Sequence, residues 1–330
     1  MTLIKTEDAA GQVLCHDITQ IIPGAYKGAR FRKGHIVAPE DIPVLLSMGK
    51  ERLYIWEKKP GTLHEEEAAE ILCALSAGAH IERGKVREGK IELFASCRGL
   101  FKVKSKALFA LNRLEGIIIA TRRGNQRVEK GDRLAGVKVV PLIIEENLLR
   151  TAEALCNEHA GGKLLEVLPF AHKRAGLVIT GSEVYHKRIQ DGFGPVIREK
   201  LTPYDVEFAD TLVLDDDHRR ITERCLEMIE DQCDLIICTG GMSVDPDDKT
   251  PLGIKNTGAA IVSYGAPVLP GGMMMLAYYM KETQRIPIIG LPACVMYSQQ
   301  TVFDLILPRI MADDEITKAS LAALGEGGLL

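Results

Sequence analysis

A glycine pair and several carboxylates follow a short apolar run in the C-terminal half of the chain. The run Asp234 to Cys238 leads into Thr239-Gly-Gly241, and acidic residues continue to Asp248. Adjacent glycines let backbone N–H groups approach a ligand without a Cβ in the way, and the helix start expected at Thr250-Pro251 favours an anion. Carboxylates beside such a turn repel a phosphate unless a hard cation such as Mg²⁺ lies between them. The spacing indicates a metal-assisted site for a phosphorylated small molecule at the carboxyl end of a strand.

The segment after residue 170 predicts strands and helices in alternation. We expect strands at 174–181, 206–214, 234–238, 260–262 and 286–289, and helices at 194–201, 217–233 and 298–310, the last ending near Pro308. This order predicts an α/β domain whose mostly parallel sheet is covered by helices on both faces, in three layers.

Polar and acidic residues follow three of these expected strands. Thr180-Gly-Ser-Glu183 follows the first, Asp215 to Asp217 follow the second, and the glycine pair follows the third. Because the carboxyl ends of parallel strands share one edge, Glu183, Asp191, Asp216 and Asp248 can face one crevice. Taken singly, each has a structural interpretation, since Asp216 suits a helix N-terminus and Asp191 suits an Asx-turn.

Residues 1–170 predict smaller segments of mixed character. Helices are expected at 39–49, 62–77 and 144–159, and the second carries three glutamates in its first turn. Short β runs separated by glycines over 80–142 predict a small barrel or sandwich. We therefore expect an α+β segment at 1–79, a β-rich middle domain with a connecting helix at 80–170, and the α/β domain at 171–330.

Charge and cysteine usage narrow the class of protein. Residues 1–150 carry 25 basic and 19 acidic residues, whereas the remainder carry 16 and 26. The basic residues are spread out and not interleaved with aromatics, which argues against a nucleic-acid partner. The eight cysteines lack zinc-site spacing and are typical of reduced thiols in a cytoplasmic protein. No apolar run can span a bilayer, and the first residues lack the core of a secretory signal.

The order of motifs over about 174–310 carries a resemblance to a known family. The matching segments are Thr180-Gly-Ser-Glu183, Gln190-Asp-Gly-Phe-Gly-Pro195, Asp216-Asp217, Asp234-Leu-Ile-Ile-Cys-Thr-Gly-Gly241, Asp248-Lys-Thr-Pro251, Leu269-Pro-Gly271 and Ile289-Gly-Leu-Pro292. As a set they resemble the molybdopterin-binding domain of molybdenum-cofactor biosynthesis proteins, as a divergent member. The resemblance implies an α/β fold and, as ligand, molybdopterin, a pterin with a dithiolene and a terminal phosphate.

The resemblance covers two enzyme branches, molybdopterin adenylyltransferases and molybdenumtransferases. The segments at 190–195 and 248–251 are more similar to the first branch, and those at 242–244, 270–271 and 290–292 to the second. Two positions depart from the molybdenumtransferase pattern: Gly272-Met-Met-Met275 follows the Pro-Gly, and Ala293-Cys-Val295 follows the Gly-Leu-Pro. These changes remove a cation and an amide from the place where the family holds its ligand.

The resemblance also implies roles for individual residues. Glu183, Asp216 and Asp248 are expected to organise Mg²⁺, and Asp191 and Asp248 are the expected catalytic residues. The expected substrate-binding residues are Thr180, Gly181, Ser182, Asp191, Thr239, Gly240, Gly241, Ser243, Pro270 and Gly271.

The function favoured by the sequence is a molybdenumtransferase-like step, in which molybdate is inserted and adenylylated molybdopterin is cleaved. Three alternatives stay open: a molybdopterin adenylyltransferase, a non-catalytic carrier that delivers cofactor to a molybdoenzyme, and a nucleotide-binding hydrolase on a related scaffold. Self-association into a homo-oligomer is expected, and a membrane partner is not.

Overall fold

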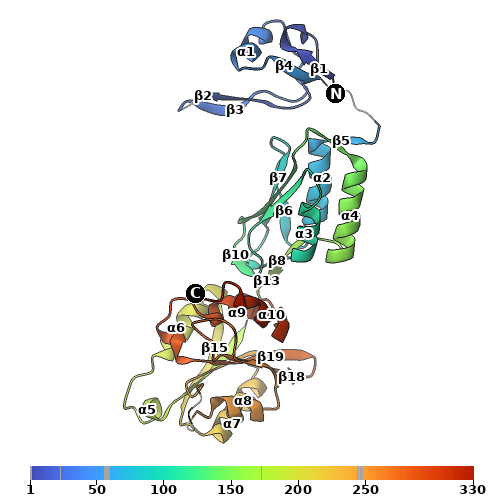
Figure 1. The fold of residues 1–330 in the computed structure, drawn as a ribbon. Coiled ribbons are helices and arrows are strands. Elements are labelled where there is room, and N and C mark those ends of the chain that lie inside the picture. Colours follow the sequence, from blue (N-terminus) through green and yellow to red (C-terminus); the bar gives the residue numbers. More distant parts are fainter. Residues whose placement is uncertain (1, 23, 56–59, 172, 244, 246–247) are drawn as a thin grey trace. The chain divides into compact units, whose positions relative to one another are not determined.

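The computed structural model describes residues 2–22, 24–55, 60–171, 173–243, 245 and 248–330. The chain forms two compact units. Unit 1 comprises residues 1–97, 101–124 and 129–167, and unit 2 comprises residues 98–100, 125–128 and 168–330. Figure 1 shows the elements of each unit. Among the described residues, no helix has the length and apolar character needed to cross a bilayer.

A six-stranded sheet forms the centre of unit 2, in the order β15-β14-β16-β19-β18-β17. The first four strands of this order run parallel, and β18 is antiparallel to both of its neighbours. The mostly parallel sheet predicted from the alternating pattern is thus confirmed. The strands are β14 (Arg174–Thr180), β15 (Glu207–Leu214), β16 (Leu235–Thr239), β17 (Ala260–Tyr264), β18 (Met275–Lys281) and β19 (Gln284–Leu291).

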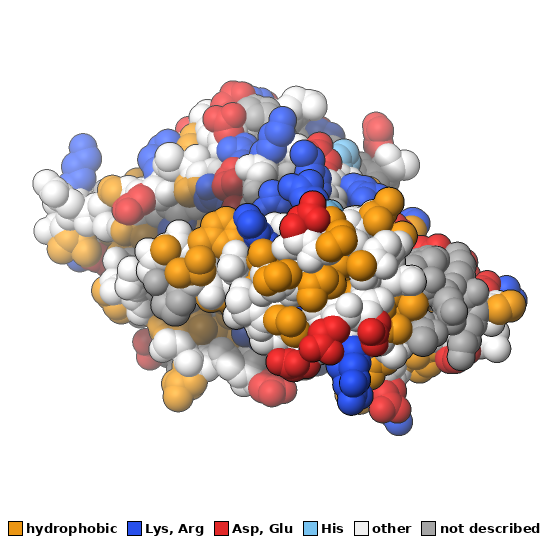
Figure 2. Space-filling model, turned by 90° about the horizontal axis from the view of Figure 1, so that it is seen from above, with side chains coloured by type: hydrophobic (Ala, Val, Ile, Leu, Met, Phe, Trp, Pro, Cys, Tyr) orange, Lys and Arg blue, Asp and Glu red, His pale blue; other side chains and the backbone are white. Residues whose placement is uncertain are grey.

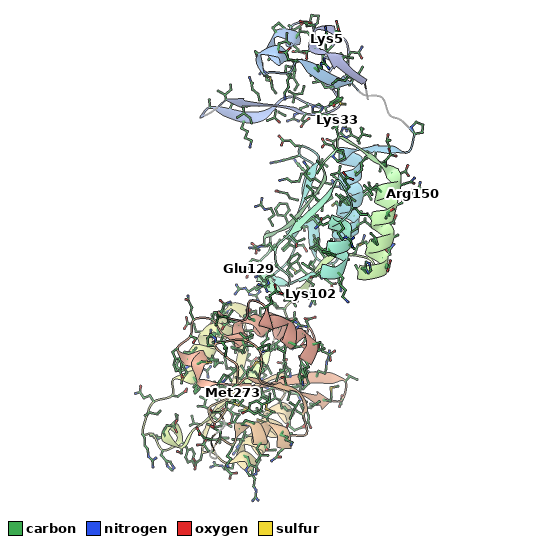
Figure 3. All side chains as sticks on the ribbon, in the orientation of Figure 1. Lys5, Lys33, Lys102, Glu129, Arg150 and Met273 are labelled. Carbon is green, nitrogen blue, oxygen red and sulfur yellow. The ribbon has the colours of Figure 1, made fainter. Side chains whose placement is uncertain are left out.

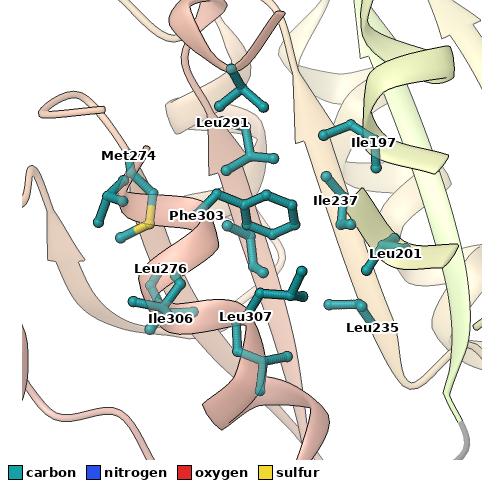
Figure 4. Packing of buried hydrophobic residues seen from close by; sticks show 14 of the residues in the cluster. Ile197, Leu201, Leu235, Ile237, Met274, Leu276, Leu291, Phe303, Ile306 and Leu307 are labelled. Atoms are coloured by element: carbon teal, nitrogen blue, oxygen red, sulfur yellow. The ribbon is translucent and has the colours of Figure 1, made fainter. Parts of the chain in front are cut away.

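Helices cover both faces of this sheet because successive residues of its central strands are apolar on both sides. Leu177 and Ile237 belong to the core beneath α6 and α9, which Figure 4 shows from close by. Val178 and Ile236 belong to the core beneath α7 and α8. The helices of unit 2 are α5 (Ser182–Tyr185), α6 (Phe193–Leu201), α7 (His218–Glu230), α8 (Thr250–Asn256), α9 (Val302–Met311) and α10 (Lys318–Ala322).

Two details of unit 2 differ from the sequence prediction. Pro308 lies inside α9 and does not end it, so the predicted end near Pro308 is wrong. The helix begins at Val302 because Thr301 and Asp304 form a capping box there. Strand β18 was not predicted. It pairs with β19 over its whole length, which adds a reversed strand to an otherwise parallel arrangement.

The N-terminal part of unit 1 is a small α+β segment with its own core. Strand β1 pairs with β4, and β2 pairs with β3 as a hairpin. Leu14, Ile18, Phe31, Leu45 and Leu53 form the buried centre. The elements are β1 (Thr2–Lys5), the 3-10 turn Thr6–Asp8, β2 (Ile18–Ile22), β3 (Tyr26–Phe31), α1 (Asp41–Ser47) and β4 (Arg52–Ile55).

The middle part of unit 1 is an open antiparallel sheet in the order β6-β7-β11-β9. Helix α2 packs on β7 and β11. Strands β8 and β10 pair in a second sheet, in the order β10-β8-β13. The strands therefore do not close into the predicted barrel. The prediction missed α3, whose Ala107 and Leu111 are buried at helical spacing. On α4, Arg150 Nη2 lies 2.8 Å from Glu146 Oε1, one turn earlier (Figure 3).

This part of the chain, from residue 62 to residue 169, contains nine strands and three helices in the described structure. They are β5 (Thr62–His64), α2 (Glu65–Ser76), β6 (Ile81–Arg83), β7 (Lys90–Ala95), β8 (Gly99–Val103), α3 (Ser105–Asn112), β9 (Ile117–Thr121), β10 (Gln126–Val128), β11 (Arg133–Val139), β12 (Ile143–Glu145), α4 (Glu146–Ala160) and β13 (Leu165–Pro169).

Candidate functional site

The strand order of unit 2 creates a switch point at the carboxyl ends of β14 and β16. The chain leaves β14 through α6 to reach β15 on one side, and returns through α7 to reach β16 on the other side. Helices α6 and α7 lie on opposite faces of the sheet. Because the two connections diverge there, these strand ends are the place where ligands of open α/β sheets bind.

The glycine pair after β16 lies directly against the end of β14. Gly240 has φ +83°, and a Cβ added there would come 2.1 Å from the carbonyl oxygen of Thr180. Gly241 has φ +50°, and its Cβ would lie 3.1 Å from Thr250 Oγ1 and 3.5 Å from Asp216 Oδ1. The hydroxyls of Thr180 and Thr250 are 3.0 Å apart. The glycines therefore allow a close approach of β14, β16 and the start of α8.

Asp216 is the carboxylate at the centre of this group. Its Oδ2 accepts a hydrogen bond of 2.9 Å from the N–H of Ser182. Burial is the main reason that the pKa of Asp216 is raised, and the charges of Asp215, Glu183 and Asp248 raise it further, whereas the bond from Ser182 lowers it. The charges of Glu183 and Asp248 therefore act on the Asp216 carboxylate.

Thr239 carries a buried hydroxyl at the end of β16. The residue is fully buried, and its Oγ1 has no hydrogen-bond partner within the described part of the chain. It shares the strand face of Leu235 and Ile237, which is the face beneath α6 and α9. An unpaired buried hydroxyl costs free energy, so Thr239 is a polar group that the described fold leaves unsatisfied.

Three other predicted residues make contacts that are structural. Asp191 accepts hydrogen bonds from the N–H groups of Phe193 at 2.8 Å and Gly194 at 3.0 Å, which is the Asx-type arrangement that its position before a helix suits. The carbonyl of Pro270 accepts a bond of 3.3 Å from the N–H of Val302. A Cβ at Gly271 would lie 2.6 Å from Val302 Cγ1. Nothing described for Asp191, Pro270 or Gly271 joins them to the Asp216 group.

Tyr264, at the end of β17, is a site residue that the sequence did not reveal. Its hydroxyl donates to the carbonyls of Met242 at 3.1 Å and Ser243 at 3.2 Å, and so supports the loop that follows the glycine pair. Burial and the charge of Asp248 raise the pKa of this phenol. The Ser243 side chain is exposed. No local motif marks Tyr264, because its partners are about twenty residues away in the chain.

The carboxylates do not form a complete metal cage by themselves. Among the described residues there is no group of three His, Cys, Asp or Glu side chains that could hold a metal ion. Mg²⁺ is, however, usually held by one or two carboxylates together with phosphate oxygens of a substrate and water. The donor set near Asp216 fits that second arrangement.

Comparison with known families identifies two segments of the chain. Residues 176–312 match the family described as "Probable molybdopterin binding domain". Residues 3–57 match a family described as "Domain of unknown function (DUF8806)". The first match spans the strands β15, β16 and β19, together with the Asp216 group and the glycine pair.

Curated relatives and solved structures are similar over parts of the chain. A "CinA-like protein" of Mycobacterium tuberculosis (strain ATCC 25618 / H37Rv) is 40% identical over 77 residues, which are 23% of this chain and 18% of that protein. The tungsten cofactor synthesizing protein MoaB from Pyrococcus furiosus has a TM-score of 0.36 at 16% identity, covering 42% of this chain and 92% of that one. The protein CinA from Thermoplasma acidophilum has a TM-score of 0.35 at 16% identity, with coverages of 42% and 98%.

Proposed function

We propose, because residues 176–312 form a domain of the molybdopterin-binding family, that this chain binds molybdopterin at the carboxyl ends of β14 and β16. The observation that carries the proposal is the meeting of Thr180, Asp216 and Gly241 at the switch point. Ligand-binding proteins of this topology use the same edge of the sheet. The proposed site residues come from three separate strand ends and the start of α8.

The terminal phosphate of the ligand lies, in this proposal, against the glycine turn. The backbone N–H groups of Gly240 and Gly241 can approach an anion closely because glycine has no Cβ. Gly181, Ser182 and Ser243 line the rest of the turn.

Mg²⁺ would neutralise the phosphate when bound, held by one or two of the carboxylates Glu183, Asp216 and Asp248 together with oxygens of the ligand. The raised pKa of Asp216 supports this role, since a cation replaces the proton that burial and neighbouring carboxylates favour. Asp191 stabilises the start of α6 and thereby positions the adjacent loop.

The reaction we propose is a molybdenumtransferase-like step, with molybdate and adenylylated molybdopterin as substrates and AMP as product. The glycine turn and the grouped carboxylates support it. A second candidate is a non-catalytic carrier that hands the cofactor to a molybdoenzyme. It is favoured by the replacement at 272–275, where methionines follow the Pro-Gly.

The test is a binding and turnover experiment on the purified chain. Molybdopterin and adenylylated molybdopterin are each titrated, and AMP release is followed with Mg²⁺ and molybdate present. Binding of both with AMP release supports the transferase, and binding without release supports the carrier. Absence of binding to either pterin contradicts both.

Two variants sharpen this experiment. Asp248→Ala should abolish Mg²⁺-dependent AMP release and change the thermal unfolding little, because Asp248 is half-buried and its carboxylate accepts a local bond of 2.9 Å from the N–H of Asp245. Asp210→Ala, an exposed carboxylate on β15, serves as the matched control and should keep full turnover. Equal turnover in the two variants would remove the metal role of Asp248.

A further inference from the structure

The hairpin β2–β3 of unit 1 is an arm whose outer half has no cover in the described structure. Its base is anchored, since Ile18 and Phe31 are buried in the N-terminal core. Its outer part is exposed: Ile21 is 65% exposed, Ile22 45% and Tyr26 45%. A two-stranded hairpin is marginally stable in water without packing on an apolar face. The arm therefore exposes an apolar surface whose burial would stabilise it.

One face of the arm combines an apolar and a basic side chain. Ile21 pairs directly with Lys27 across the hairpin, so the two side chains lie on the same face. Lys27 is exposed, and no ion pair of its ammonium group is seen within the described residues. On the opposite face, the ring of Tyr26 lies over Gly28, where a Cβ would come 2.9 Å from the Tyr26 hydroxyl. Thr19, nearer the base on the Ile21–Lys27 face, donates to Glu88 Oε1 at 2.9 Å. The outer part of this face, at Ile21 and Lys27, is therefore the part left free to dock.

A hollow of complementary chemistry lies elsewhere on unit 1, where β9 and β11 meet the start of α4. Its volume is ≈ 610 Å³. We call this hollow the groove, and it is lined by Gly116, Val140, Pro141, Ile143 and Leu148, with Glu115 and Glu145 at its rim.

The groove is open, apolar and acidic at its margin. Val140 is 63% exposed. Gly116 leaves space in the groove because it has no side chain, and a Cβ there would meet Pro141 Cδ at 3.2 Å. Glu115 and Glu145 are exposed, and neither makes an ion pair with another described residue. Exposed hydrophobic side chains also gather among charged groups on the face shown in Figure 2.

We propose that the Ile21–Lys27 face of the arm docks in the groove of a second copy of this chain, and that the reciprocal contact closes a two-fold dimer. The apolar part of each surface matches the other, and Lys27 meets the carboxylates at the rim. Both halves of the contact are present on one chain, so two copies bury two arms and two grooves at once. A second copy is therefore the occupant that these charges and apolar surfaces fit.

The first test disrupts each surface separately and measures the dimer dissociation constant of the full chain by sedimentation equilibrium. Ile21→Asp on the arm and Val140→Asp in the groove should each raise Kd by about 10-fold or more, because each places a charge in a buried apolar contact. Ile261→Asp is the control, since Ile261 is 44% exposed on β17, outside both surfaces. It should leave Kd unchanged.

The second test exchanges the charges. Lys27→Glu alone and the pair Glu115→Lys with Glu145→Lys alone should each be monomeric, because each homodimer would juxtapose like charges at both contacts. Mixing the two proteins should restore a heterodimer, since one contact then has both charges reversed and the other has both original. A contact formed within a single chain cannot give this result.

The two tests together decide the proposal. Far-ultraviolet circular dichroism and a thermal melt establish that each variant is folded, and only folded variants are compared. A wild-type chain that stays monomeric at about 100 μM overturns the proposal. So does a dimer that tolerates Ile21→Asp or Val140→Asp, and so does a mixture of the two charge variants that stays monomeric.

Discussion

In the six-stranded sheet, basic side chains at the amino ends of the strands are paired, whereas the Asp216 carboxylate at the carboxyl ends is not paired in the described structure. We call these two places the amino-end edge and the carboxyl-end edge. At the amino-end edge, Lys173 is almost fully buried and pairs with Asp313, and Arg309 pairs with Asp314. At the carboxyl-end edge, Asp216 lies near Glu183 and Asp248 without a basic partner among the described residues, and its pKa is raised. A buried charge is tolerated only when an opposite charge and hydrogen bonds compensate for its lost hydration. The contrast indicates that the charges at the amino ends of the strands stabilise the fold, whereas Asp216 at the carboxyl ends costs stability when it is ionised.

The largest expected effect is on the glycine turn of the carboxyl-end edge. Gly240→Ala should destabilise the protein by about 3 kcal/mol or more, because the new Cβ combines a positive φ with a clash against the Thr180 carbonyl. Gly258→Ala is the matched control, since Gly258 has the same φ of +83° with nothing within 4 Å. It should cost about 1 kcal/mol. Urea unfolding measures both, and equal losses would show that the turn can move away from β14.

The next largest effect is on stability, through the Lys173–Asp313 ion pair at the amino-end edge. Asp313→Asn should destabilise the protein by about 1–2 kcal/mol at neutral pH, because it removes the charge that faces the buried ammonium of Lys173. Asparagine is chosen because it tolerates the φ of +53° at this position. Glu282→Gln, an exposed residue at φ +55°, removes a charge elsewhere and should change the free energy of unfolding by less than about 0.5 kcal/mol. Similar losses in both variants would mean that Lys173 is satisfied by other groups.

Two threonines of the carboxyl-end edge should respond in opposite directions. Thr239→Val should stabilise the unliganded chain by about 1 kcal/mol, because it removes a buried hydroxyl without a partner in the described structure. Thr180→Val should destabilise it by about 1 kcal/mol, because it breaks the 3.0 Å bond to Thr250. Chemical unfolding without ligand measures both changes. A loss of stability in Thr239→Val would mean that water already satisfies this hydroxyl.

The smallest effect is the pH dependence of Asp216. Its folded pKa is raised above the ordinary value of 3.8, so the folded state holds this proton more tightly than the unfolded state does. Stability from this group is present below pH 3.8 and is lost as pH rises through the folded pKa. Asp216→Asn should therefore match the wild type in acid and melt at a higher temperature at neutral pH. A variant that melts lower at neutral pH would show that the ionised carboxylate stabilises the fold, with the bond from Ser182 outweighing burial and the neighbouring acids.

Much of the fold of unit 2 was predictable because its signals are local. The strands at 174–180 and 235–239 are runs of buried apolar residues, and Asp217 caps α7 as its residue type favours. The middle part of unit 1 was less predictable. Short strands separated by glycines fit a barrel as well as an open sheet, and only the packing of α2 on β7 and β11 distinguishes the two.

The candidate site was predictable in part. The sequence located Glu183, Asp216 and Asp248 in turns that follow strands, and the structure brings their charges together. It grouped Asp191 with them as well, but the carboxylate of Asp191 is engaged by the first N–H groups of α6. A carboxylate before a helix can either bind the first N–H groups of that helix or face a ligand. Which of the two it does depends on neighbours that are distant in sequence.

The sequence by itself determined the alternation of strands and helices after residue 170, the glycine turn and the positions of the acidic residues, because these depend on residue type and spacing along one segment. Only the tertiary structure decided which acids share a field, which hydroxyl is left unpaired among the described residues, and that Tyr264 supports the loop at Met242 and Ser243. Those outcomes depend on strand order and on burial, which are set by contacts between residues far apart in the chain.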